Sequence, residues 1–156
     1  MDIKAILVPV DFSEYSEKAF VWALDMAEKW KATITLLHVV PTPPYSPVVM
    51  GSYFDPSAFE RNLLADAETS AHDLIDRQAR RSVPTGIKVC VGEPFRDICR
   101  IAEEEQMGLI IMGSHGRTGL SHIMLGSVAE RVVRHAPCPV LVVSKIAPAQ
   151  DEQVSR

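Results

Sequence analysis

The sequence predicts an α/β fold in which helices cover both faces of an open, parallel β-sheet. Five short apolar runs rich in Val and Ile punctuate the chain, at residues 5–10, 33–40, 87–91, 109–112 and 140–143. Most of these runs are continuously apolar, which is typical of strands with two buried faces. Amphipathic helical patterns separate them, and this alternation favours βαβ units with right-handed crossovers.

The first predicted helix begins at Ser13, where Glu14 and Glu17 favour the positive end of a helix dipole. A second helix is predicted over residues 56–81. Both have an apolar stripe at helical spacing, which we expect to pack on the sheet for purely structural reasons. The stripes are Ala19, Ala23, Met26, Ala27 and Trp30 in the first helix, and Leu63, Leu64, Ala67, Ala71, Leu74 and Ile75 in the second.

Two shorter helices follow. The third begins at Pro94, because proline is favoured in the first turn of a helix. Its inward residues are Phe95, Ile98, Cys99 and Ala102. The fourth runs from Ser127 to about His135, since Pro137 stops it shortly afterwards.

The length and composition indicate one globular domain. The chain has 156 residues and a mass of 17.2 kDa, and 47% of its residues are hydrophobic. We expect the domain to span residues 1–146, and residues 147–156, which lack a core pattern, to form a flexible tail. No apolar stretch is long enough for a membrane span and no cleavable signal is evident, so we expect a cytoplasmic protein without a membrane partner.

Charge and residue spacing disfavour several kinds of site. The formal charge of −4 and a pI near 5.7 argue against a nucleic-acid surface, which needs clustered Lys and Arg. Cys90, Cys99 and Cys138 form no C-x2-C pair and are expected in the core. The five histidines show no ligand spacing, so no metal held by the protein alone is predicted.

A glycine-rich segment is the main functional signal. Gly113, Gly116 and the pair Gly126-Ser127 follow the pattern G-x2-G-x9-G-S between a predicted strand and a predicted helix. Glycine lets backbone approach a phosphate closely, and a helix N-terminus favours an anion. Ser127 with Glu130 also matches a capping box. The alternative is that these glycines only turn the chain and that Ser127 only caps the helix.

The predicted fold places a ligand at the carboxyl ends of the strands, where the strand order reverses. Three segments meet there: residues 8–13, residues 37–40 and the glycine segment. The proline-rich residues 41–47 follow the second strand and cannot easily form helix. They form either a lid or a surface loop without ligand contact.

Several fragments in order together resemble the universal stress protein family, in its ATP-binding branch. The fragments are Ile6-Leu7-Val8-Pro9-Val10-Asp11-Phe12-Ser13, Leu36-Leu37-His38-Val39, Val91-Gly92-Glu93-Pro94, Ile110-Ile111-Met112-Gly113-Ser114-His115-Gly116-Arg117 with Gly126-Ser127-Val128, and Pro137-Cys138-Pro139-Val140-Leu141-Val142-Val143. The resemblance implies a three-layer, Rossmann-like fold of the adenine nucleotide alpha hydrolase type, with strand order 3-2-1-4-5. It also implies a homodimer through the edge strand Val140–Val143; a monomer that covers this edge with its tail is the alternative.

The same resemblance implies the roles of individual residues. Pro9, Val10 and Asp11 would border the adenosine, and the Val39 backbone would read the adenine edge. Asp11 would meet the ribose or a magnesium ion, or else would only cap the first helix. The phosphates of ATP would meet Gly113, Gly116, Gly126, Ser127, Val128 and, secondarily, Arg117. Met112 would pack near the ribose or base, or simply in the core, and Mg²⁺ would be held mainly by phosphate oxygens.

Three functions are compatible with these features. The leading hypothesis is a dimeric, ATP-binding regulator of a stress response, with no assigned catalytic residue and at most slow ATP hydrolysis, because the G-x4-G-K-[ST] loop is absent. An adenylating or other nucleotide-handling enzyme is disfavoured, since residues 8–13 lack a Ser-Gly-Gly loop. The third is an interaction protein of the same fold that binds no nucleotide.

Gly116→Val or Gly126→Val is expected to block the approach of a phosphate, because each adds side-chain bulk where the backbone must come close.

Overall fold

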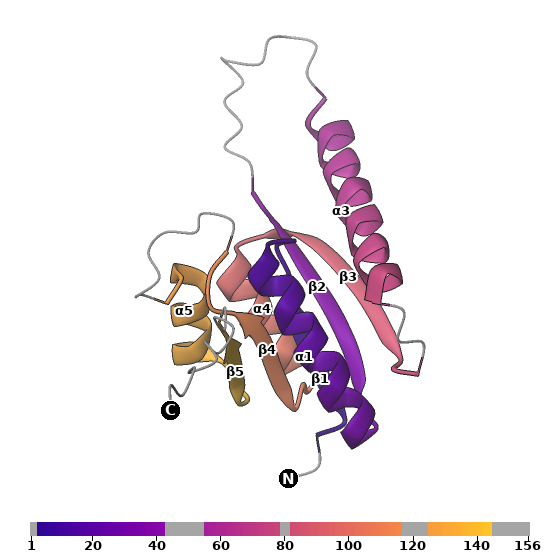
Figure 1. The fold of residues 1–156 in the computed structure, drawn as a ribbon. Helices are drawn as coiled ribbons and strands as arrows, with labels where there is room; N and C mark the ends of the chain where they lie inside the picture. The colour runs from indigo at the N-terminus through magenta and orange to yellow at the C-terminus, as the bar shows by residue number, and fades with distance from the viewer. Residues whose placement is uncertain (1–2, 43–54, 79–81, 117–124, 145–156) are drawn as a thin grey trace, which may run out of the picture.

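The computed structural model describes residues 3–42, 55–78, 82–116 and 125–144, and it contains the predicted parallel sheet (Figure 1). The strand order is β3-β2-β1-β4-β5, and every neighbouring pair is parallel. The fold class and strand order are therefore confirmed. The strands are β1 (Ala5–Pro9), β2 (Thr33–Pro41), β3 (Thr85–Gly92), β4 (Leu109–Gly113) and β5 (Val140–Val143).

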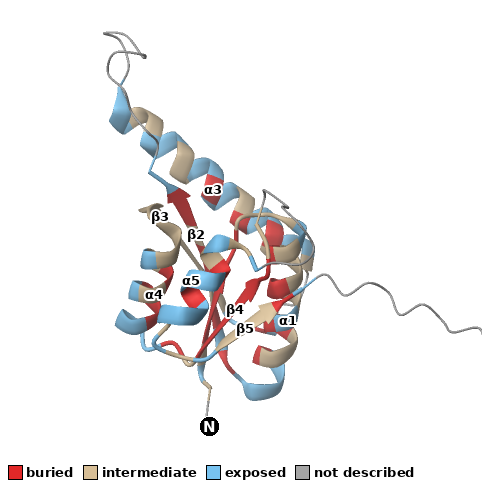
Figure 2. Cartoon of the chain, turned by 90° about the vertical axis from the view of Figure 1, so that its left-hand side faces the viewer, coloured by how far each residue is buried: buried red, intermediate tan, exposed pale blue. Residues whose placement is uncertain are grey.

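Helices cover both faces of this sheet. They are α1 (Glu14–Trp30), α3 (Pro56–Gln78), α4 (Pro94–Glu104) and α5 (Ser127–His135). On one face, Phe20 of α1 and Leu74 of α3 share a buried cluster with Ile34 of β2. On the other, Ile98 of α4 and Val132 of α5 share a second cluster with Ile110 of β4. Figure 2 shows the central strands buried between these two helical layers, whereas β3 and β5 form the partly exposed edges.

The start of α1 is as predicted. Ser13 is the N-cap, with φ −80° and ψ 159°, and its Oγ accepts a hydrogen bond from the Ser16 backbone N–H at 3.4 Å. The other end differs from the prediction, because Trp30 is 40% exposed. The helix ends at Trp30, Lys31 turns the chain with φ 53°, and the next residue, Ala32, occupies the buried position instead.

The start of α5 corrects the predicted capping box. Gly126 is the N-cap, with φ −61° and ψ 148°, and Ser127 is already the first helical residue. The Gly126 N–H donates to the Ser114 carbonyl at 2.8 Å, which fixes the chain before the helix. Glu130 pairs with Arg134 at 2.9 Å rather than reaching back. Among the described residues no side chain caps this helix N-terminus, which leaves it open to an external acceptor.

The cysteines are also less buried than expected. Cys90, Cys99 and Cys138 are half-buried at the margin of the cluster beneath α4 and α5. Cys90 lies on β3, an edge strand with only partial cover. Burial raises the pKa of the Cys99 thiol, and partial burial raises that of Cys90 too. Among the described residues there is no cluster of three or more metal-ligating side chains. Nor is any helix in this part of the chain long and apolar enough to cross a membrane.

Leu74 anchors α3 to the sheet, and its removal is the direct test of that packing. The side chain is fully buried, so Leu74→Ala should lower the free energy of unfolding by about 2–5 kcal/mol through lost apolar contact and a residual cavity. Urea denaturation followed by circular dichroism measures the change. Glu68→Ala, on the exposed side of the same helix, is the control and should change stability by less than about 0.5 kcal/mol.

Candidate functional site

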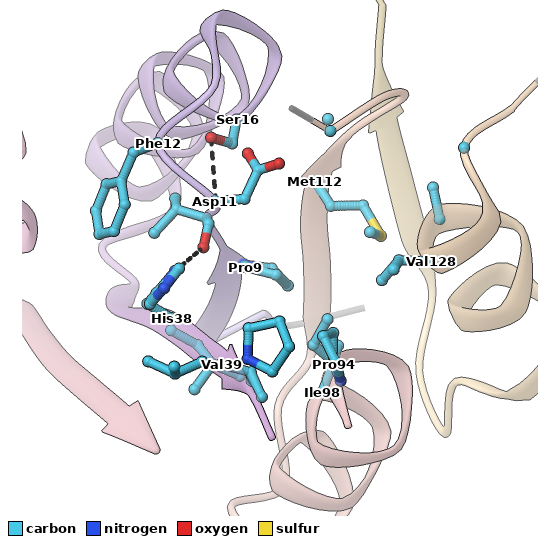
Figure 3. A pocket seen from close by; sticks show the side chains of 18 of the residues that line it. Pro9, Asp11, Phe12, Ser16, His38, Val39, Pro94, Ile98, Met112 and Val128 are labelled. Atoms are coloured by element: carbon cyan, nitrogen blue, oxygen red, sulfur yellow. Dashed lines mark hydrogen bonds between the residues drawn. The ribbon is translucent and has the colours of Figure 1, made fainter. Parts of the chain in front are cut away.

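A cavity of about 640 Å³ lies at the carboxyl ends of the central strands, which is the position that the fold class predicts. Its size is that of a small-molecule site. Figure 3 shows Pro9 of β1 between His38 and Val39 of β2 on one side and Met112 of β4 on the other. The cavity therefore spans the edge of the sheet from β2, across β1, to β4 and α5.

The structure brings the predicted site residues together around this cavity. All of them line it except Arg117, which lies outside the described residues. The lining residues of this set are Pro9, Val10, Asp11, Val39, Met112, Gly113, Gly116, Gly126, Ser127 and Val128. Met112 is 5% exposed and belongs to the core beneath α4 and α5, so it packs in the core and also borders the cavity.

Two hydrogen bonds fix the chain where β1 leaves the sheet. The Val10 N–H donates to the Leu37 carbonyl at 2.8 Å, and the His38 ring lies with Nδ1 2.7 Å from the Val10 carbonyl oxygen. Because a carbonyl only accepts, His38 Nδ1 must carry the hydrogen. The His38 ring also packs on Phe12, with ring centroids 4.6 Å apart. The loop after β1 is thus held against the end of β2.

The Val39 backbone faces the space that β1 vacates. In a parallel strand the N–H and C=O of one residue point the same way, and this direction alternates along the strand. Since the Leu37 carbonyl accepts from Val10, the backbone groups of Leu37 and Val39 both point toward β1. The β1 register ends at the pair Pro9 and Leu37, whereas β2 continues to Pro41. Val39 therefore presents a donor and an acceptor, side by side, to the cavity.

Asp11 is oriented by the start of α1. Its Oδ1 accepts from the Ser13 N–H at 3.1 Å and from the Ser13 hydroxyl at 2.5 Å, and its own N–H lies 3.4 Å from Ser16 Oγ. Oδ2 is directed toward the glycine segment, because a Cβ built on Gly116 would lie only 2.7 Å from it. Asp11 thus supports the Ser13 cap and also places a carboxylate in the cavity.

The first turn of α5 forms the opposite wall. Ser127, Val128 and Ala129 line the cavity, and the helix terminus presents backbone N–H groups and the positive end of the helix dipole. Ser114 holds this turn in place: its carbonyl accepts from Gly126, and its N–H donates to the Val143 carbonyl, both at 2.8 Å. An anion in the cavity would be stabilised at this end.

The glycines also have packing roles that their spacing does not indicate. A Cβ on Gly113 would lie 2.9 Å from backbone and side-chain atoms of Tyr15, and a Cβ on Gly126 would lie 3.2 Å from the Ser114 carbonyl oxygen. Gly113 therefore allows β4 to approach the start of α1. Substitutions at Gly116 and Gly126 would displace Asp11 and Ser114 as well as fill ligand space, so they cannot test phosphate approach alone.

Sequence reasoning missed part of the lining. Phe12, His38 and Ser114 lie inside fragments already singled out, so their position beside the predicted residues was a signal for them. His115, which lies in one of the same fragments, also lines the cavity, with its Nδ1 3.0 Å from Ser114 Oγ. Residues of α3 and α4 carried no local signal, because only tertiary packing brings them to the rim. They are Leu63, Asp66, Ala67, Ser70 and Ile98, whereas Pro94, which also lines the cavity, lies inside a fragment already singled out.

Comparison with known proteins identifies the family. The model of the universal stress protein family matches residues 2–144. The chain belongs to the universal stress protein family. Among curated relatives, the universal stress protein MJ0577 of Methanocaldococcus jannaschii is 34% identical over 154 residues, which cover 91% of this chain and 95% of the relative. The universal stress protein YxiE of Bacillus subtilis is 30% identical over 146 residues, covering 88% of this chain and 97% of the relative.

Solved structures agree with this assignment. The structure of MJ0577 superposes with a TM-score of 0.75 at 32% identity, covering 93% of this chain and 98% of that one. A universal stress protein from Archaeoglobus fulgidus, solved in complex with dAMP, has a TM-score of 0.58 at 22% identity, covering 92% of this chain and 99% of that one. The second likeness is distant and shows the shared fold alone.

Gly113→Ala tests the packing role of the first glycine. The added Cβ would meet the Tyr15 backbone at 2.9 Å, so β4 or α1 must shift, and we expect a loss of about 1–3 kcal/mol in the free energy of unfolding. Gly86→Ala on β3 is the matched control, since a Cβ there would meet only the Ile34 carbonyl oxygen at 4.0 Å. Chemical denaturation of both variants measures the difference; equal stabilities would contradict the packing role.

Proposed function

We propose that this universal stress protein binds ATP in the cavity and acts as a dimeric, nucleotide-responsive regulator of a stress response in the cytoplasm. The observation that carries the proposal is the N-terminus of α5, which no side chain in the described ranges caps and which faces the same cavity as the Val39 backbone donor and acceptor. An anion site and a base-reading edge at opposite ends of one cavity are the two features that a nucleotide requires.

The base is assigned to the β2 end of the cavity. A backbone N–H matches the N1 acceptor of adenine, and a backbone carbonyl matches its N6 amino group. Val39 supplies both groups. Leu37, Ile98 and Met112 offer apolar surface beside this edge for the faces of the ring. Pro9 and Val10 then border the adenosine between the base and the sugar.

The sugar and phosphates are assigned to the loop after β1 and to the start of α5. Asp11 accepts hydrogen bonds from ribose hydroxyls, because a carboxylate close to a triphosphate without a cation would be repelled. The backbone of Gly113, Gly116 and Gly126 and the first turn at Ser127 and Val128 hold the phosphates. Arg117 would pair with a phosphate from outside the described residues.

The donor set of the cavity fits a magnesium nucleotide rather than a dedicated metal site. Asp11 is a hard oxygen donor near the phosphate end, and Mg²⁺ in such sites binds phosphate oxygens, water and one or two carboxylates. Bound Mg²⁺ would neutralise phosphate charge. We assign no residue to catalysis, so the proposed activity is binding, with at most slow hydrolysis.

The dimer is assigned to the outer edge of β5. The Pro139 carbonyl accepts from Ile110 and the Val143 carbonyl accepts from Ser114, so alternate residues from Pro139 to Val143 point toward β4. Val140 and Val142 therefore point their backbone groups to the open edge, where a second β5 can pair. Nucleotide occupancy is proposed to reach this edge through Ser114, which links the start of α5 to Val143.

Ser127→Pro tests the phosphate site without adding bulk to a glycine. Proline is favoured at the first helical position, and Gly126, with ψ 148°, already has the conformation that proline requires of its predecessor. The change removes one backbone donor, which should weaken ATP binding roughly ten- to a hundredfold, as for a hydrogen bond to a charged group. Ser127→Ala, which removes only the hydroxyl, is the control. Calorimetric titration with MgATP measures both, and equal affinities would contradict the backbone contact.

Val142→Pro tests the dimer. The substitution removes an N–H that points away from β4, so the fold should remain intact while edge pairing is lost. We expect the wild-type protein to sediment as a dimer and the variant as a monomer at the same micromolar concentration. A wild-type protein that is monomeric, or a variant that remains dimeric, would contradict pairing through β5.

A further inference from the structure

One wall of the cavity comes from α3 and belongs to neither the glycine segment nor the loop after β1. Leu63, Asp66, Ala67 and Ser70 all line the cavity. Their spacing of i, i+3, i+4 and i+7 places them on one face of the helix. Three of them are small or apolar, and Asp66 is the only carboxylate that the described part of α3 directs to the cavity.

The packing of α3 places this wall at the base end of the cavity. Ala71 and Leu74 belong to the buried cluster that contains Leu36 of β2. The helix runs back along β2, so its earlier turns lie toward and beyond the end of that strand (Figure 1). His38 and Val40 share the Leu36 face of β2 and also line the cavity. Asp66 therefore lies near the Val39 end, on the far side of β1 from the glycine segment.

The Asp66 side chain is available to a ligand. Among the described residues its carboxylate makes no hydrogen bond or ion pair, and its backbone carbonyl accepts from the Ser70 hydroxyl at 2.9 Å. An ionised carboxylate can only accept hydrogen bonds.

We propose that Asp66 is a specificity-determining residue that selects a 6-amino purine over a 6-oxo purine. The inference rests on the proposed function. In the proposed pose the Val39 carbonyl accepts one hydrogen of the adenine N6 amino group, and Asp66 accepts the other. A 6-oxo purine would instead direct a carbonyl oxygen at both the Val39 carbonyl and the Asp66 carboxylate. Specificity then comes from repulsion of the wrong base as well as attraction of the right one.

The test compares ATP with inosine triphosphate, which differs at the 6-position of the base and keeps the sugar and phosphates. Calorimetric titrations at fixed Mg²⁺ and ionic strength give the ratio of the two dissociation constants. We expect the wild-type protein to bind ATP at least about tenfold more tightly. Asp66→Ala should reduce this ratio by about tenfold. Asp66→Asn should reduce it further, because an amide can donate to the 6-oxo group.

Glu68→Gln is the matched control, since it removes a charge from the exposed side of the same helix and should leave the ratio unchanged. An unchanged ratio in both Asp66 variants would overturn the inference while leaving ATP binding intact. Equal weakening of both nucleotides would overturn it as well, because it would indicate a contact with the shared sugar or phosphates. A wild-type protein that binds neither nucleotide would overturn the proposed function itself, and the inference with it.

Discussion

The early departure of β1 from the sheet is the constraint on which the site depends. β1 pairs with β2 only as far as Pro9, while β2 continues to Pro41. Bonds from Val10 to Leu37 and from His38 to Val10 hold the departing chain. If β1 continued, it would satisfy the Val39 backbone and fill the cavity with its own residues. Its departure leaves backbone groups that can pair with a flat, polar-edged molecule, in the crevice where α/β sheets bind ligands.

The second wall follows from helix geometry rather than from any reactive side chain. Gly126 is the N-cap of α5 and has no side chain, and the Ser114 carbonyl fixes its position by accepting a hydrogen bond from the Gly126 N–H. The orphan N–H groups of the first turn then face the cavity. A serine or aspartate at the N-cap would satisfy one of these donors internally and compete with an anion. Glycine at this position therefore suits a helix terminus that is completed by a ligand.

The fold was predictable because strands buried on both faces have continuously apolar sequences. Val140–Val143 has the expected bounds, and the other strands differ from the prediction by only one or two residues at their ends. The glycine segment and residues 8–13 were predictable as a rim because the fold class places them there. Ser127 was misplaced by one position, because a capping-box pattern does not reveal that Gly126 is held by a distant carbonyl. The α3 wall that contains Asp66 was not predictable. The apolar stripe of this helix has the pattern of ordinary core packing, and only tertiary contact brings the helix to the cavity.

The glycines show why spacing alone does not assign a role. Gly113 fits a phosphate-binding pattern, yet the Tyr15 backbone occupies the space that a side chain would need. Gly116 accommodates the Asp11 carboxylate in the same way. Both requirements, close packing and ligand approach, select the same residue.

The central claim is that the cavity holds an adenine nucleotide. The most direct measurement is the nucleotide content of the freshly purified protein. Freshly purified protein is denatured, any released nucleotide is identified by chromatography and mass, and the emptied, refolded protein is titrated with MgATP. We expect released adenine nucleotide or saturable binding of one ATP per chain. A folded protein that releases no nucleotide and shows no saturable ATP binding would contradict it.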